Sequence, residues 1–208
     1  MLGMMSVAVL LAAGPAIVEP DNLESTFQSL KEAVAQKDAS RVKTLAVQAN
    51  MLARNIIAAP APEGDEEKTA WNGRVTFAHE VELFTEYSLY TTAIQSPPAI
   101  TVALLGTLEQ QNPDSKYLTD AYGIYFYALR QTDGTAKIPA IAEKAIGHFP
   151  NNDDLLLVMA ESAYGHKQMD RALGFAKRLT AAIGRRARPE GMTASDWEHK
   201  RSVALASG

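Results

Sequence analysis

Apolar residues recur at intervals of three and four along almost the whole chain after its first twenty residues. The segment LESTFQSLKEAVA shows the pattern, because Leu23, Phe27, Leu30 and Val34 fall on one face of a helix. The alternation of apolar and polar residues that marks a half-buried strand is almost absent. The sequence therefore predicts an all-α fold.

The first predicted unit is an antiparallel helical hairpin in residues 21–62. Asp21 begins a capping-box pattern at the start of the first helix. A turn ends at Ser40, and we expect this serine to cap the second helix. The stretch from Ala58 to Glu67 combines two prolines with an acidic run, which predicts an exposed loop or linker.

A longer helix is expected from about Thr69 to Gln95. It carries two apolar rows: Phe77, Val81 and Phe84 in one, and Leu83, Tyr87, Tyr90 and Ile94 in the other. A helix that is apolar on two sides is normally packed between neighbours, so we expect both rows to be buried. Ser96 and Pro97 suit the start of a short helix that ends near Gln111.

The most informative stretch runs from Thr119 to Gly184 and contains an internal repeat. Its two copies start at Thr119 and Asp153, which are 34 residues apart. Six positions correspond, and five of them are apolar in both copies: Tyr122 with Leu156, Tyr125 with Met159, Ala128 with Ser162, Ile138 with Ala172, Ala142 with Ala176 and Ala145 with Leu179. Each copy is expected to form a helical hairpin.

The repeat resembles the tetratricopeptide repeat family, whose units are stacked helical hairpins of this length. Ala160 and Ala172 stand at the two positions where that family has small residues, and Pro150 stands at its closing proline. Three departures are visible. Phe126 fills the small position of the first copy, Gly184 replaces the closing proline of the second, and the aromatic residue expected late in the second helix appears only as Phe175, one place early.

The resemblance implies antiparallel hairpins stacked as a right-handed superhelix over residues 66–208, clearest at 119–186. The alternative is an irregular helical bundle. In this family the concave groove is lined by the second, fifth, ninth and twelfth residues of each first helix. In this chain these are Asp120, Gly123, Tyr127 and Arg130, then Asp154, Leu157, Glu161 and Tyr164.

Six of these residues are therefore predicted to bind a protein or peptide partner: Asp120, Tyr127, Arg130, Asp154, Glu161 and Tyr164. Aromatic and arginine side chains supply much of the binding energy in peptide recognition, so Tyr127, Arg130 and Tyr164 are the main candidates. The competing interpretation is that the tyrosines pack within the chain itself.

The end of the chain predicts one more helix, because Ser195 and Glu198 have capping-box spacing. Trp197 supplies an apolar side chain in its first turn. No second helix follows to complete a hairpin. We expect the helix either to cap the array or to cover a neighbouring copy in a homo-oligomer.

The N-terminal residues 1–20 form a signal-like apolar segment. The run from Met4 to Ala13 is too short to span a bilayer but has the length of a signal-peptide core, although no Lys or Arg precedes it. The alternative is a first helix docked on the fold. The junction from Asn112 to Tyr117 is similar to repeats of bacterial outer-membrane assembly lipoproteins. We therefore expect a periplasmic or exported protein, with a cytoplasmic one as the alternative.

The composition restricts the chemistry. There is no cysteine, which excludes disulfides, thiolate metal sites and cysteine nucleophiles. The formal net charge is −4, so the chain has no excess of basic residues of the kind expected in a nucleic-acid-binding protein. We also expect no cofactor and no stable membrane insertion.

Three local patterns could carry chemistry. His79, Glu82 and Glu86 share a helical face that could present metal ligands, but the second histidine of a zinc-protease helix is replaced by Leu83. The run from Asn151 to Asp154 lacks the remainder of a calcium loop, and helix capping explains it. Arg185, Arg186 and Arg188 with Lys177 and Arg178 form a basic patch, which we interpret as a solvated surface.

These observations favour a non-enzymatic interaction scaffold, of the bacterial cell envelope, over the alternative of a metal-dependent helical-bundle enzyme that uses His79 and nearby carboxylates.

Overall fold

The computed structural model describes residues 22–185, 188 and 193–207, and this part of the chain is helical throughout, without strands. The elements are α1 (Leu23–Ala35), α2 (Ala39–Ala58), α3 (Asp65–Ala93), α4 (Pro98–Gln111), α5 (Leu118–Arg130), the 3₁₀ helix η1 (Thr135–Lys137), α6 (Ile138–Ala145), α7 (Asp153–Gly165), α8 (Met169–Arg185) and α9 (Ala194–Ser207). The all-α prediction is confirmed. No helix in these described ranges combines the length and apolar character that a membrane span requires.

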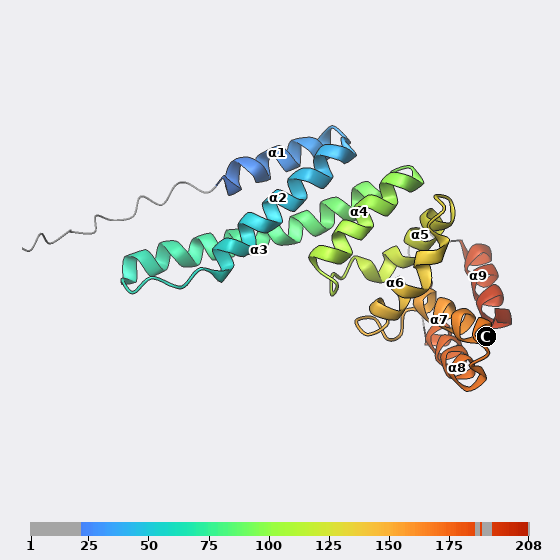
Figure 1. Cartoon of the computed structure of the whole chain (residues 1–208). Helices are drawn as coiled ribbons and strands as arrows, with labels where there is room; N and C mark the ends of the chain where they lie inside the picture. Colours follow the sequence, from blue (N-terminus) through green and yellow to red (C-terminus); the bar gives the residue numbers. More distant parts are fainter. Residues whose placement is uncertain (1–21, 186–187, 189–192, 208) are drawn as a thin grey trace, which may run out of the picture.

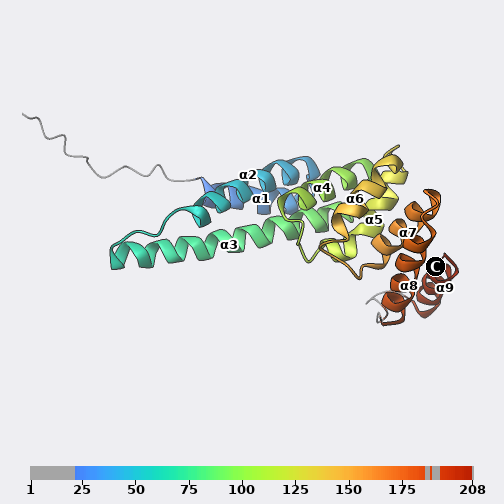
Figure 2. The ribbon, with the colours of Figure 1, turned by 60° about the horizontal axis from the view of Figure 1, so that its bottom comes forward.

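Most helices pack against the helix that follows them in the chain, and α1 with α3, α2 with α4, and α5 with α7 make additional contacts. The result is an elongated array in which the helices follow one another from α1 to α9 (Figures 1 and 2). The N-terminal part of α3 projects from one end of this array (Figures 1 and 2).

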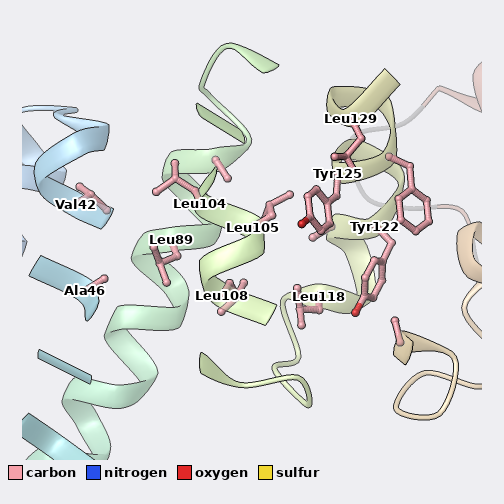
Figure 3. Close-up of a cluster of buried hydrophobic side chains, with 14 of the residues drawn as sticks. Val42, Ala46, Leu89, Leu104, Leu105, Leu108, Leu118, Tyr122, Tyr125 and Leu129 are labelled. Carbon is pink, nitrogen blue, oxygen red and sulfur yellow. The ribbon is translucent and has the colours of Figure 1, made fainter. Parts of the chain in front are cut away.

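A single large core cluster extends from α1 to α7. Figure 3 shows its centre, where α4 lies between α3 and α5: Leu104 lies on the side of Leu89 and Leu105 on the side of Tyr125. A smaller cluster of Leu156, Leu179 and Ile183 joins α7 to α8. Burial of these apolar side chains is the main force that holds neighbouring helices together.

The helix starts differ from the sequence prediction in several places. Asp38 caps α2 by accepting a hydrogen bond from the Arg41 backbone N–H at 3.0 Å, so the helix begins before Ser40. The acidic run that was expected to be a loop forms the first turn of α3, from Asp65, because carboxylates stabilise the positive end of a helix. The predicted cap at Asp21 lies outside the described residues.

The two apolar rows of α3 have different environments. Val81 is fully buried, and the rings of Phe77 and Phe84 make edge contacts with Phe27 of α1 at centroid distances of 5.6 and 5.1 Å. In the second row, Leu83 is 57 % exposed and Tyr87 is 45 % exposed. The prediction that both rows are buried is therefore wrong, because the neighbouring helices cover the first row and leave much of the second in contact with water.

The burial pattern recurs with the predicted 34-residue spacing. The four clearest pairs are buried in both copies: Tyr122 with Leu156, Tyr125 with Met159, Ala142 with Ala176 and Ala145 with Leu179. The second helices differ, because α6 ends at Ala145 whereas α8 continues to Arg185. Helices α7 and α8 pack closely, while α5 and α6 meet mainly through η1. Phe126, which occupies the small-residue position of the first copy, is 2 % exposed, whereas the second copy has Ala160 there.

The last helix, α9, packs on α8 and buries Trp197. Its cap is Thr193, whose Oγ1 accepts a hydrogen bond from the Asp196 N–H at 3.1 Å and donates one to Asp196 Oδ2 at 2.6 Å. The capping box therefore lies two residues before the predicted pair of Ser195 and Glu198.

Candidate partner-binding face

Two neighbouring helices carry the six predicted partner-binding residues. Asp120, Tyr127 and Arg130 lie on α5, and Asp154, Glu161 and Tyr164 lie on α7. Within each helix the successive spacings of seven and three residues place the side chains on one face. We call this set of six residues the α5/α7 face.

The two tyrosines of the α5/α7 face point into solvent. Tyr127 is 60 % exposed and Tyr164 is 68 % exposed. Arg130 and Glu161 are exposed as well, whereas Asp154 is half-buried. The competing interpretation, in which both tyrosines pack within the chain, is therefore wrong for these described side chains.

The two helices approach closely at the N-terminal end of the face. A Cβ atom added to Gly123 would lie only 2.9 Å from Asp154 Oδ2, which is closer than side-chain atoms normally approach. The atoms that such a Cβ would meet belong to the end of the Asp154 side chain, so glycine at this position leaves room for that carboxylate. The contact links the fifth residue of one predicted repeat to the second residue of the next.

A pocket of about 760 Å³ opens beside this contact, between the start of α5, residues 148–153 and the C-terminal part of α8. Asp120 lines this pocket, and the other five residues of the α5/α7 face do not. Arg178 closes one side, where its Nη2 donates a hydrogen bond to the Pro150 carbonyl at 2.5 Å. The structure thus separates Asp120 from the exposed tyrosines, which stand farther along the helices.

Aromatic side chains of α3 contact the segment at the start of α5. Burial raises the pKa of Tyr90, and the negative charge of nearby Asp120 raises it further, so α3 and the start of α5 are close. The ring of Tyr117 joins them, because it stacks on Tyr90 at 5.5 Å and meets Tyr87 at 6.0 Å. The Lys116 ammonium lies 5.0 Å from the centre of the Tyr117 ring.

Sequence reasoning did not assign Leu83, Tyr87 and Ile94 to the surface. Their helical spacing showed an apolar row, which usually means burial. The exposure of these side chains depends on which helices pack on α3, and helical periodicity does not indicate which helices those are.

The predicted metal-ligand group on α3 is not assembled. His79 Nδ1 lies 3.2 Å from Glu82 Oε2, while Arg54 Nε lies 3.3 Å from the other oxygen of that carboxylate. Glu86 turns into the protein and is 6 % exposed. Across the described ranges, no group of three or more His, Asp or Glu side chains is arranged to hold a metal ion.

Glu86 instead holds the segment between α4 and α5. Its Oε1 accepts a hydrogen bond from Asn112 Nδ2 and its Oε2 accepts one from Ser115 Oγ, both at 2.7 Å. Neither Ser115 nor Asp114 caps α5, which has no side-chain cap. The hydrogen bond from the serine hydroxyl offsets part of the free-energy cost of burying the Glu86 carboxylate.

The remaining polar patterns have structural roles. Asn152 caps α7 by accepting a hydrogen bond from the Leu155 N–H at 3.0 Å, as expected for the 151–154 run. In the basic patch, Arg178 lies over the ring of Phe175, with its guanidinium carbon 5.5 Å from the ring centre. Arg186 lies outside the described residues.

Comparisons of the chain with family models, with curated proteins and with solved structures find no match.

Proposed function

We propose that this protein is a non-enzymatic interaction scaffold that holds a peptide or protein partner on the α5/α7 face. The observation that carries the proposal is the exposure of two tyrosines, Tyr127 and Tyr164, on adjacent helices of an all-helical array. Large aromatic side chains in solvent favour contact with a second molecule.

We further propose that the hairpins stack as a tetratricopeptide-like right-handed superhelix. The recurrence of buried positions at the 34-residue spacing supports this arrangement, as does the contact between α5 and α7. In such a stack the first helices of successive hairpins share one surface, and α3, α5 and α7 would present Tyr87, Tyr127 and Tyr164 to the same partner.

The chemistry of the face suits an extended or helical peptide. The exposed rings offer apolar area with few rotatable bonds, so a partner that covers them loses little side-chain entropy. Arg130 and Glu161 add charges of opposite sign around the rings. We expect them to orient the partner and to contribute less energy than the rings do.

The experiment immobilises the full chain and identifies proteins that it retains from extract of its source cells. Tyr127→Ala/Arg130→Ala and Tyr164→Ala are compared with the unmodified chain. We expect both variants to lose the same partners, with affinity falling by a factor of about 30 or more if each truncation removes about 2 kcal/mol.

The matched control is Met51→Ala. Met51 is 56 % exposed and lies on α2, away from the face, so this variant should retain the partners. If the two tyrosine variants bind as well as the control, the α5/α7 face is not the binding surface. Circular dichroism of each variant verifies that the helices are intact.

We also propose that the scaffold works in the bacterial cell envelope. The signal-like run from Met4 to Ala13 and the similarity of the 112–117 junction to envelope lipoprotein repeats support this location. Fractionation of the source bacterium, with N-terminal sequencing of the mature protein, tests it. A chain found in the cytosol with its first residues intact would contradict the proposal.

A further inference from the structure

The pocket beside the α5/α7 face shares only Asp120 with that face. Its volume of about 760 Å³ lies within the range of about 300–1,000 Å³ that is usual for sites that bind small molecules. Its walls come from the start of α5, from residues 148–153 and from the C-terminal part of α8. We call it the Asp120/Arg178 pocket, after the exposed charged residues of its α5 wall and its α8 wall.

Contacts within the chain hold two of these walls together. Asn152 Nδ2 donates a hydrogen bond to the Thr119 carbonyl at 2.7 Å, and the ring of Phe149 lies 5.9 Å from that of Tyr122. These contacts fix residues 148–153 against α5. A site whose walls are in place before the ligand arrives loses less conformational entropy on binding.

Arg178 supplies the positive charge of the α8 wall. Its Nη2 donates a hydrogen bond to the Pro150 carbonyl at 2.5 Å, and its guanidinium carbon lies 5.5 Å from the centre of the Phe175 ring. These contacts position the guanidinium, which has five N–H donors in total. A guanidinium suits a carboxylate, because the two groups can form parallel hydrogen bonds.

Asp120 supplies the negative charge of the α5 wall, in the first turn of that helix. An ionised carboxylate has about four lone-pair sites, so it can accept hydrogen bonds from the chain and from a ligand at the same time. Two other titratable groups line the pocket. Asp153 is only 6 % exposed, and His148 has its Nδ1 2.7 Å from Asp114 Oδ1. Asp120 is therefore the carboxylate that a ligand can reach most easily.

Charges of both signs restrict the class of ligand. A simple anion would be repelled by Asp120, and a simple cation would be repelled by Arg178. An apolar molecule would remove water from both charges without replacing the lost hydrogen bonds. A molecule with a positive group at one end and a negative group at the other matches the two walls.

We propose that the Asp120/Arg178 pocket binds a short peptide with free termini, whose ammonium group contacts Asp120 and whose carboxylate contacts Arg178. The volume is larger than a single amino acid occupies, so it has room for a peptide of a few residues. Thr119 and Asn151 offer exposed polar side chains to the peptide backbone, and Ala181 offers an apolar surface. The proposal does not depend on a partner at the α5/α7 face.

The test titrates the full, isotope-labelled chain with trialanine, which has two charged ends and small side chains. Two-dimensional NMR follows the backbone amides. We expect saturable shifts at Thr119, Asn151 and Ala181, and none at Tyr127 or Tyr164. Shifts at the two tyrosines alone would support the α5/α7 face as a binding surface and would contradict the proposal for the pocket.

Two altered peptides test the roles of the charged ends. N-acetyltrialanine lacks the ammonium group, and trialaninamide lacks the carboxylate. Each loses one charge-assisted hydrogen bond, so each should bind about tenfold more weakly than trialanine, or weaker still. Equal affinity for all three peptides would overturn the proposal.

Two variants assign each end of the peptide to a residue. Asp120→Asn should weaken the binding of trialanine by about tenfold and leave the affinity for N-acetyltrialanine unchanged, because that peptide has no ammonium group to lose. Arg178→Gln should weaken the binding of trialanine in the same way and leave the affinity for trialaninamide unchanged. The matched control is Lys177→Gln, because Lys177 is an exposed cation on α8 that does not line the pocket.

The proposal fails if trialanine causes no saturable shift at the pocket. It also fails if Asp120→Asn weakens the binding of all three peptides equally, or if Lys177→Gln weakens the binding of trialanine as much as Arg178→Gln does. Circular dichroism of each variant verifies that the helices are intact.

Discussion

The hydrogen bonds of Glu86 lead to a prediction about stability. Glu86→Gln keeps one oxygen that can accept a hydrogen bond from Asn112 or Ser115, but it turns an amide N–H group toward the other donor. The original carboxylate makes two hydrogen bonds of 2.7 Å in a site that is 6 % exposed. Such charge-assisted bonds contribute about 1.5–3 kcal/mol each, so we expect a loss of about 2–3 kcal/mol.

Urea denaturation followed by circular dichroism measures this loss. In a thermal melt of the same variant, the melting temperature should fall by about 4–12 °C, because 1 kcal/mol corresponds to about 2–4 °C for a chain of this size. The matched control is Glu80→Gln on the exposed side of the same helix, which should change stability by no more than about 0.5 kcal/mol.

A double-mutant cycle shows whether the loss comes from the named partner. Ser115→Ala removes one donor, and combining it with Glu86→Gln should cost less than the sum of the two single changes, with a coupling of about 0.5–3 kcal/mol. If Glu86→Gln behaves like Glu80→Gln, or if the two changes are additive, the carboxylate does not hold the 112–117 segment and the argument fails.

Four other changes test the packing, the α7 cap and the burial of Glu109. Phe126→Ala should lower the free energy of unfolding by about 3–5 kcal/mol, because the ring is 2 % exposed and its loss leaves a cavity. Ala160→Phe should lower it by about 1–3 kcal/mol or more, because the larger side chain overpacks the site. Urea denaturation measures both changes. Asn152→Ala should cost about 1–2 kcal/mol through loss of the α7 cap, and equal stability of the variant would contradict that role. Glu109 of α4 is 8 % exposed, and burial raises its pKa above the ordinary value of 4.5. The stability that neutral Glu109 contributes is complete below pH 4.5 and is lost as pH rises through the raised pKa, so the stability gained by Glu109→Gln should increase as pH rises from 4 to 7.

The helical elements could be predicted because their signals are local. The spacing of Leu23, Phe27 and Leu30 requires only one helix to be formed, and the Asn152 cap requires only three residues beyond it. The buried positions that recur after 34 residues also follow a local pattern, which occurs in each of the two repeat copies. Such features depend on sequence neighbours, so they survive whatever the distant packing is.

The exposed face of α3 could not be predicted for the opposite reason. Leu83 and Tyr87 have the same spacing as residues that are buried, and their exposure follows from where α1, α2 and α4 pack. The burial of carboxylates could not be predicted for the same reason. Glu86 has its partners 26 and 29 residues away, and before the chain folds nothing distinguishes it from the solvated Glu80.

Glu86 shows how one buried carboxylate joins parts of the array that are distant in the sequence. It fixes the segment before α5 to α3 through Asn112 and Ser115, and this anchor lies within a core that is continuous from α1 to α7. The α5 helix is therefore held to the N-terminal helices both by apolar packing and by charge-assisted hydrogen bonds.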